Sequence, residues 1–487
     1  MTPALSSMQR PVLDPIVLLG ALLMMGNLGT VLHKSSRVYL FQQAQCFNYY
    51  RIHDATKIGA NYRIEEALCK LPLVQSRLSM VDGADSFLQS LPPLLVLGVY
   101  KTLLERLGLR RLVVLSFCCS ALAVLYSITA FWLHQVWTTQ AALLSFLFDL
   151  VGGGDMVRIT IVCTCIADVS PPEKLTNTYN YISGSYFIAS LVGSTIGSLL
   201  LSNHVYLLNA LSIFCYLATA YIATSIPAHY GRDDPKVEAL ESSYDDISSP
   251  VPPSMSSFER STAKRHSISQ LLISSWRSSY KSLLTLFSGP NPTFTVIILL
   301  LIYGIAVRIE VILPQYISLA LGWPLATVNR AQALKALISA ASLFALPSIR
   351  KRYLEPQFVT RGGSTAVDLF ITQASLVANT IGIVALGFHA GAPFFILALC
   401  VYTSGTGLAD SLTSYGTFML PAGESLAEFY VRTGLVSTVG ALIGGPLWSA
   451  ALSFVLQSEW IPLGTPFWLC AGLFGLGCAG VVTLKSA

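Results

Sequence analysis

Apolar stretches of about 20 residues recur along this chain from Pro15 to Leu484, and their number, about twelve, most constrains its fold. An α-helix of that length just crosses the roughly 30 Å hydrocarbon layer of a bilayer. Of the 487 residues, 53% are hydrophobic and only 11% are charged, whereas a soluble domain carries about 25% charged residues. The sequence therefore predicts an all-α membrane protein and excludes the water-soluble fold classes.

The predicted spans form two groups of six on either side of a polar interval. They cover residues 15–33, 86–104, 112–132, 140–166, 178–201, 206–226, 293–313, 327–348, 369–388, 392–414, 430–455 and 464–484. The first apolar run exceeds the 7 to 15 residues of a signal-peptide core, so we expect it to remain as a span. We expect two six-helix bundles, at 15–226 and 293–484, and a long extracellular loop at 34–85.

Basic residues give the predicted orientation, because cytoplasmic loops of membrane proteins are enriched in Lys and Arg. The short loops after the third, fifth, seventh, ninth and eleventh spans contain neither residue. The loops on the opposite side contain Arg106, Arg110, Arg111, Lys174, Arg350, Lys351, Arg352 and Arg361. We therefore expect residues 1–14 to form a cytoplasmic tail. The net charge of +5 follows from this asymmetry and does not indicate a nucleic-acid partner.

The polar interval at 227–292 predicts a cytoplasmic linker between the bundles. Residues 227–265 are rich in Ser, Pro and acidic side chains, a composition that cannot pack a core. Residues 267–287 place leucines and Trp276 near helical spacing against polar residues, which is typical of an amphipathic helix lying in the membrane interface.

Two cysteines lie outside the apolar runs. Cys46 and Cys69 both fall in the predicted extracellular loop, on the oxidising side of the membrane. We expect them to form a disulfide, which would restrict that loop.

Several segments together carry a family resemblance. They are CFNYYRIHDATKIG and RIEEALCKLPLVQS in the first loop, ERLGLRRLVVLS, GGGDMVRITIVCTCIADVSPPEKLTNTY, and PQYISLALGWPLATVN in the second half. With them the chain resembles the major facilitator superfamily, and more closely the fungal members that accompany secondary-metabolite gene clusters. The resemblance implies two bundles around a central cavity, a plasma-membrane location, and transport by alternating access. It also suggests efflux of a fungal metabolite or toxin.

The same resemblance implies a gating loop between the second and third spans. An acid in this loop can bond the positive end of a neighbouring helix and hold the inward gate shut; a solvated positive-inside loop is the alternative. The residues that fit are Glu105, Arg106, Gly108, Arg110 and Arg111. Lys101 stands where the family has Gly. In the fifth span Gly193 is followed by Ser194, where the family's exporters have Pro.

The fourth span places charged residues inside an apolar run. Asp149, Asp155 and Arg158 surround a Gly152–Gly154 triplet, and the last two charges are three residues apart, close enough to pair on one helix face. A carboxylate whose partner can change is suited to proton coupling, because desolvation raises its pKa and a nearby Arg lowers it. A permanent structural ion pair is the equally weighted alternative.

The second half offers further pairs at matching depths. Glu310 and Lys335 lie within reach across a predicted helical hairpin, and Asp410 and Arg432 lie near the inner ends of their spans. Arg308 has no partner that the sequence identifies. Each of these residues is a candidate for substrate or proton contact, with structural pairing as the alternative.

Signatures of soluble enzymes and of primary pumps are absent from the sequence. There is no phosphate-binding loop for ATP, no His and Cys cluster at metal-ligand spacing, and no nucleophile elbow. We therefore expect a monomeric, non-enzymatic transporter without cofactor or metal, which moves an amphipathic organic molecule and protons across a lipid bilayer. Proton-coupled uptake is the first alternative. A non-transporting accessory protein or a membrane-embedded biosynthetic enzyme on the same scaffold is the second.

Overall fold

The computed structural model describes residues 15–59, 62–133, 139–159, 162, 175–226, 292–358, 363–388, 390–420, 426–458 and 460–484. The predicted tail at 1–14 and almost all of the linker at 227–292, with its amphipathic helix, lie outside these residues. All regular structure in the described part is helical. Ten of its helices are long and apolar enough to cross a membrane.

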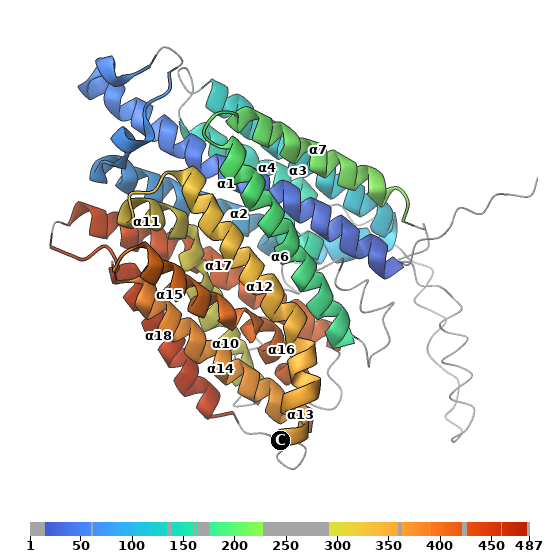
Figure 1. The fold of residues 1–487 in the computed structure, drawn as a ribbon. Coiled ribbons are helices and arrows are strands. Elements are labelled where there is room, and N and C mark those ends of the chain that lie inside the picture. The colour runs from blue at the N-terminus through green and yellow to red at the C-terminus, as the bar shows by residue number, and fades with distance from the viewer. Residues whose placement is uncertain are drawn as a thin grey trace, which may run out of the picture.

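The N-terminal half consists of helices that run back and forth beside one another (Figure 1). They are α1 (Pro15–His53), α2 (Pro72–Leu107), α3 (Leu109–Trp132), η3 (Thr139–Ser145) continuing into α4 (Phe146–Gly152), α6 (Leu175–Leu200) and α7 (Val205–Ala223). The helix of α4 resumes at residues 154–159 after a break at Gly153. Together these elements occupy the six predicted spans of the first half.

The C-terminal half repeats the plan, with three of its spans divided into shorter helical segments. The first span comprises α10 (Pro292–Ala306), η6 (Val307–Val311) and α11 (Leu313–Ala320), and the second comprises α12 (Leu325–Ile349), the π-turn η7 (Arg350–Leu354) and α13 (Glu355–Phe358). The others are α14 (Gly363–Leu386), then α15 (Ala392–Ser404), η8 (Gly405–Gly407) and α16 (Leu408–Phe418), and finally α17 (Leu426–Gln457) and α18 (Thr465–Val482). The predicted all-α, twelve-span architecture is confirmed.

The predicted loop at 34–85 is wrong in extent. Helix α1 continues to His53 and α2 begins at Pro72, so only residues 54–71 connect them, with the short helices η1 (Ala55–Lys57) and η2 (Glu66–Lys70). The polar residues that follow the apolar run are buried against protein: Ser36, Arg37 and Gln42 are all at most 6% exposed. A hydropathy pattern detects the part of a helix that faces lipid. It therefore misses the polar part of α1 that packs against protein.

The connection between α1 and α2 forms a small folded unit on the end of α1. Cys46 of α1 is joined to Cys69 of η2 by a disulfide, and both sulfurs are buried with Phe47, Tyr50 and Ile64. The Gln43 side chain makes hydrogen bonds of 3.0 and 3.1 Å to the backbone of Ile64. The unit is thus fixed to the N-terminal half.

The two halves meet along two helix pairs, α2 with α17 and α6 with α12 (Figure 1). Small residues permit the close approach, as is usual between membrane helices. A Cβ added to Gly83 would lie 2.6 Å from Cβ of Ser449, and one added to Gly184 would lie 2.8 Å from the Phe344 ring. Polar contacts join α2 to α17 toward the N-terminal end of α2, where Ser76 Oγ and Ser453 Oγ are 2.7 Å apart.

The disulfide-linked unit also reaches across to the C-terminal half. Glu66 Oε1 accepts a hydrogen bond of 2.7 Å from the backbone N–H of Leu325, the first residue of α12. Lys70 Nζ donates to the carbonyl oxygens of Ser318 and Trp323, at 3.2 and 3.0 Å. An acid therefore meets a helix N-terminus and a base meets carbonyls at a helix C-terminal end, both favourable placements for the helix dipole. We call these contacts the outer latch, after the predicted extracellular side.

Candidate functional site

The glycine triplet of the fourth span breaks the helix and turns it. Gly153 adopts φ 82° and Gly154 φ 70°, left-handed values that favour glycine. A Cβ added to Gly152 would lie 2.7 Å from Cβ of Cys119 in α3, so this glycine allows close packing there. The helix resumes at residue 154, and Asp155 and Arg158 follow within its first turns.

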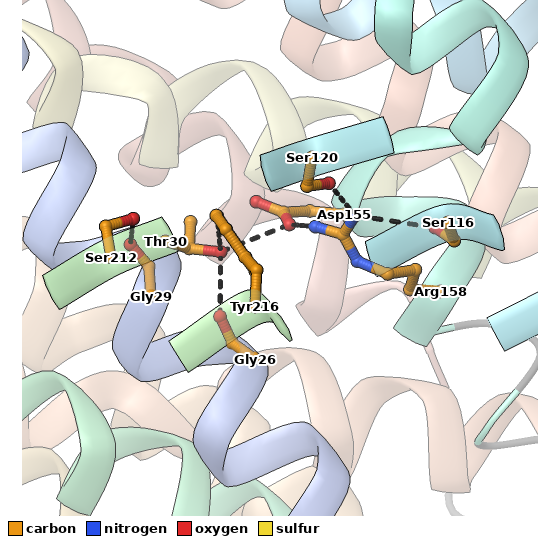
Figure 2. A network of polar contacts seen from close by, with 9 residues as sticks. All are labelled: Gly26, Gly29, Thr30, Ser116, Ser120, Asp155, Arg158, Ser212 and Tyr216. Carbon is orange, nitrogen blue, oxygen red and sulfur yellow. Dashed lines mark hydrogen bonds and ion pairs between the residues drawn. The ribbon is translucent and has the colours of Figure 1, made fainter. Parts of the chain in front are cut away.

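Asp155 and Arg158 form an ion pair, as their spacing predicts. The Arg158 guanidinium also donates to Ser120 Oγ and, at 3.4 Å, to Ser116 Oγ of α3. It lies 5.0 Å from the Phe117 ring centroid, at cation–π distance. The guanidinium is therefore held on several sides by α3 (Figure 2).

Asp155 is held more loosely than its partner. Its carboxylate accepts a hydrogen bond of 3.3 Å from Thr30 Oγ1 of α1, and Thr30 in turn lies 3.0 Å from the Tyr216 hydroxyl of α7 (Figure 2). The Asp155 side chain is 38% exposed and the Arg158 side chain 8%. The pair therefore has one fixed member, the cation, and one accessible member, the carboxylate.

Asp149 lies one turn before the break and is half-buried. Within the part of the chain that the structure describes, its carboxylate makes no hydrogen bond, but it interacts electrostatically with Arg158 and Asp155. The three charged residues predicted in this span therefore lie in one electrostatic cluster.

A second ion pair in this half was missed by the sequence analysis. The Arg37 guanidinium of α1 contacts the Asp85 carboxylate of α2, and it also donates to Ser145 Oγ at 3.3 Å. Gln89 donates to the other Asp85 oxygen at 2.8 Å, and Asp82, one turn away, is 9% exposed. Residues 34–85 were assigned to a loop from the sequence, and their charges were therefore not considered. The available signal was Asp82 and Asp85, two acidic residues three apart beside an apolar run.

In the C-terminal half, Glu310 of η6 pairs with Lys335 of α12 at 2.5 Å. The pair crosses the helical hairpin, as the matching depths of the two residues in adjacent spans predicted. The Tyr402 hydroxyl of α15 donates to the same Glu310 oxygen at 3.1 Å. Tyr186 of α6 interacts electrostatically with Glu310 and also with Asp155. One tyrosine of the N-terminal half thus lies within electrostatic range of the ion pairs of both halves.

The other predicted residues have different outcomes. Asp410 lies in the first turn of α16 with an exposed side chain, and Arg432 lies near the start of α17; their pairing stays a prediction. In the predicted gating loop, Glu105 and Arg106 belong to the last turns of α2, and their side chains lie outside the described set, as does that of Lys101. Gly108 connects α2 to α3 with φ 77°, and Arg110 and Arg111 are exposed.

Packing accounts for the glycines of α6. A Cβ on Gly193 would lie 2.8 Å from Val31 Cγ1 of α1, and one on Gly197 would lie 3.2 Å from Ser35 and Asn329. Among the described residues, no group of three or more His, Cys, Asp or Glu side chains is placed to hold a metal ion.

Known proteins resemble this chain over most of its length. A family model described as Major Facilitator Superfamily matches residues 86–426. The MFS efflux pump atnC of Emericella nidulans is 23% identical over 99% of this chain and 88% of its own length. The MFS transporter SAT21 of Stachybotrys chartarum is 23% identical over 85% of this chain and 86% of its own.

Solved structures share the fold at low sequence identity. The human organic anion transporter MFSD10 superposes with a TM-score of 0.59 at 14% identity, covering 97% of this chain and all of that one. The Escherichia coli xylose transporter XylE, in a partially occluded inward-open conformation, gives 0.58 at 11% identity, over 96% and 98% of the two chains. With two bundles of membrane-spanning helices, paired charges at membrane depth and a family match over most of its length, this chain belongs to the Major Facilitator Superfamily.

Proposed function

We propose that this protein is a secondary transporter that exports a small amphipathic organic molecule by alternating access, coupled to proton movement. The observation that carries the proposal is the pair of carboxylates, Asp155 and Glu310, one in each half, each beside a cation. Charges at membrane depth cost free energy, and in transporters they mark ion and substrate pathways. The efflux direction is supported by the name of the relative atnC, an efflux pump.

Asp155 is the residue that we assign to proton coupling. Its partner Arg158 is anchored by α3, whereas the carboxylate is accessible and is held from the other side by Thr30 of α1. A local shift of α1 relative to α3 within the N-terminal half, made as the two halves rock, would change the number of donors on the carboxylate. Fewer donors favour the protonated form, so the motion and the proton would be linked.

Alternating access also requires the two halves to separate at the end where the outer latch holds them. The latch consists of hydrogen bonds from the Glu66 and Lys70 side chains to backbone groups, and the two serines Ser76 and Ser453 meet at the same end. Hydrogen bonds of this kind can be exchanged for bonds to water when the halves separate, so they suit repeated opening. The two bundles complete a transport unit within one chain, which supports a monomer, and the similarity to an efflux pump supports a plasma-membrane location.

Vesicle transport tests the function and its direction. Inverted vesicles from cells that express the chain would be equilibrated with extract of the producing culture on both sides of the membrane, and a proton gradient, acidic inside, would be imposed. Export predicts gradient-dependent accumulation of one or more extract components inside inverted vesicles. Gradient-dependent loss would instead support uptake by symport. No gradient-dependent movement in either direction would overturn transport and favour an accessory role.

A further inference from the structure

Arg308 differs from other basic side chains that the structure buries at membrane depth. Three of these contact a carboxylate: Arg37 with Asp85, Arg158 with Asp155, and Lys335 with Glu310. Arg308 makes no ion pair with any residue that the structure describes, and its Nε atom is buried without a hydrogen-bond partner. A guanidinium carries five N–H donors in a fixed plane and remains charged in proteins. Its charge is therefore left to be matched by something else.

The backbone around Arg308 is broken and supported from outside the helix. Helix α10 ends at Ala306, and the chain continues as the 3₁₀ segment η6, which contains Arg308. Carbonyl groups near the break find donors on other helices: Trp448 Nε1 of α17 donates to Ile305 O at 2.8 Å, and Cys470 Sγ of α18 lies 3.3 Å from Ala306 O. Interrupted helices at membrane depth are common at transporter binding sites, because they direct polar groups toward the substrate.

Helix α17 packs directly against this break. A Cβ on Gly444 would lie 2.6 Å from Ile305 O and 2.8 Å from Cβ of Arg308, and one on Gly440 would lie 2.9 Å from Cα of Gly304. Side chains at either glycine would push the break away from α17. Close packing thus fixes the backbone and Cβ of Arg308, while no described ion pair holds its guanidinium.

The groups near Arg308 leave its charge uncompensated. Glu310 is two residues away, but Lys335 lies 2.5 Å from it and neutralises it. The other groups that interact electrostatically with Arg308 are Tyr186 of the N-terminal half and Tyr303 of α10, which are uncharged at neutral pH. Asp410 is not among them. The net charge of Arg308, Glu310 and Lys335 is therefore +1, and it lies between aromatic side chains of both halves.

We propose that Arg308 binds an anionic oxygen group, in first place a carboxylate, on the transported molecule. The inference rests on the proposed transport function and names the chemical class of its cargo: an aromatic or otherwise amphipathic organic acid. A lone cation at mid-membrane costs free energy, and a bound carboxylate removes part of that cost through two parallel hydrogen bonds. The two tyrosines provide apolar rings beside the anion.

Metabolite profiling of a producing strain tests the inference. Deletion of the gene for this chain should shift the exported metabolites from the medium into the cells. Anion-exchange chromatography at pH 7 then separates the shifted metabolites into acids and neutral molecules. We expect the molecules that accumulate in the cells to be acids. If only neutral or basic molecules accumulate in the cells, export stands and the role of Arg308 is overturned. If no metabolite shifts, export fails and the inference fails with it.

Variants then assign the effect to the residue. In the deletion strain, Arg308→Gln should lower export of the acid by about 10-fold or more, because a hydrogen-bonded charge contributes about 1.5 to 3 kcal/mol. Arg308→Lys, which keeps the charge, should retain part of the export. Arg330→Gln is the matched control, since Arg330 is exposed, and should export normally. Wild-type export by folded Arg308→Gln protein would overturn the proposal, as would equal loss in a folded lysine variant.

Discussion

Asp155 and Arg158 are held unequally, and this inequality makes their substitutions informative. Arg158 contacts Asp155, two serines and two aromatic rings, whereas Asp155 has Arg158 and Thr30 and is partly exposed. Removing the cation leaves a carboxylate unpaired at membrane depth. Removing only the charge of the carboxylate leaves a group that can still accept from both of its donors.

The first prediction follows from this difference. Asp155→Asn should fold nearly as well as the wild type but lose gradient-driven transport, while passive exchange of cargo remains measurable. Arg158→Ala should destabilise the protein by about 1 to 3 kcal/mol, because it removes a charged hydrogen-bond donor from Asp155 and from two serines of α3. Thermal unfolding in detergent and transport across a range of pH values measure the two effects.

The double replacement Asp155→Asn with Arg158→Gln distinguishes coupling from structure. If the pair is purely structural, the double variant should regain folding and transport with the pH dependence of the wild type. That outcome would remove Asp155 as the coupling residue and leave Asp149, Glu310 and Asp410 as candidates. If Asp155 couples protons, the double variant should fold and remain uncoupled.

At the scale of single elements, the sequence predicted what depends on local pattern. The ion pair of the fourth span follows from a spacing of three residues, and the pair of Glu310 with Lys335 follows from depth in adjacent spans. Arg37 and Asp85 were not found, because they are 48 residues apart and lie where polar residues begin to outnumber apolar ones. Glu66 and Leu325 are 259 residues apart, and only the folded arrangement of both halves brings them together.

The outer latch gives the second prediction. Glu66→Ala removes the acceptor for the N-terminal N–H of α12 and should favour opening at this end, seen as faster labelling by an impermeant thiol reagent of a cysteine placed at Ser76. Glu66→Gln keeps a carbonyl oxygen that can accept the same bond, so labelling should stay near the wild-type rate. Equal labelling of all three proteins would mean that the contact does not hold the halves together.

The latch should also respond to external pH, which is the third prediction. Burial raises the pKa of the Glu66 carboxyl above its ordinary value of 4.5, so the closed contact favours the protonated form. Stability of the closed contact is then fully present below pH 4.5 and decreases as pH rises through the raised pKa. Burial lowers the pKa of Lys70 from 10.5. The closed contact should therefore become less stable as pH falls through that lowered value.

The thiolate is the reactive form of the introduced cysteine, so its labelling slows in every variant as pH falls. The Glu66→Gln protein, which has no carboxyl to titrate, serves as the control and measures this loss of thiolate alone. Acidification outside from pH 7 to pH 5 should therefore lower the ratio of the wild-type labelling rate to the control rate, and a rise in that ratio at pH 5 would contradict the sign of the effect.

The disulfide-linked unit carries the fourth prediction. Cys46 and Cys69 are separated by 23 positions, and closing a loop of that length stabilises a protein by about 3 kcal/mol on a chain-entropy estimate. Mass mapping without reduction should find the two residues linked in intact membranes. Cys46→Ser should lower the unfolding temperature of the protein, with Cys400→Ser, a free cysteine, as the control. Finding both thiols free would contradict the pairing and the extracellular placement together.

At the scale of the whole molecule, the two halves are joined by polar contacts near one end of α2 and α17. The contacts of Ser76 with Ser453, of Gln457 with Ser76, and of Ser79 with the Ser449 carbonyl all lie there. If transport requires the halves to separate at this end, then a covalent bond across the interface must stop it, while a bond within one half should not.

The final prediction uses this contrast. Cysteines at Ser76 and Ser453 should cross-link on oxidation, because their hydroxyl oxygens are 2.7 Å apart, and the cross-link should stop transport almost completely until it is reduced. The matched control is Thr380→Cys with the native Cys478, which lie 3.8 Å apart on α14 and α18 within the C-terminal half. That bond should leave transport largely intact, since it joins helices that move together. The wild type, given the same oxidant and reductant, accounts for effects on the native disulfide. Continued transport by the fully cross-linked Ser76–Ser453 pair would show that the cargo does not cross by separation of the halves at this end.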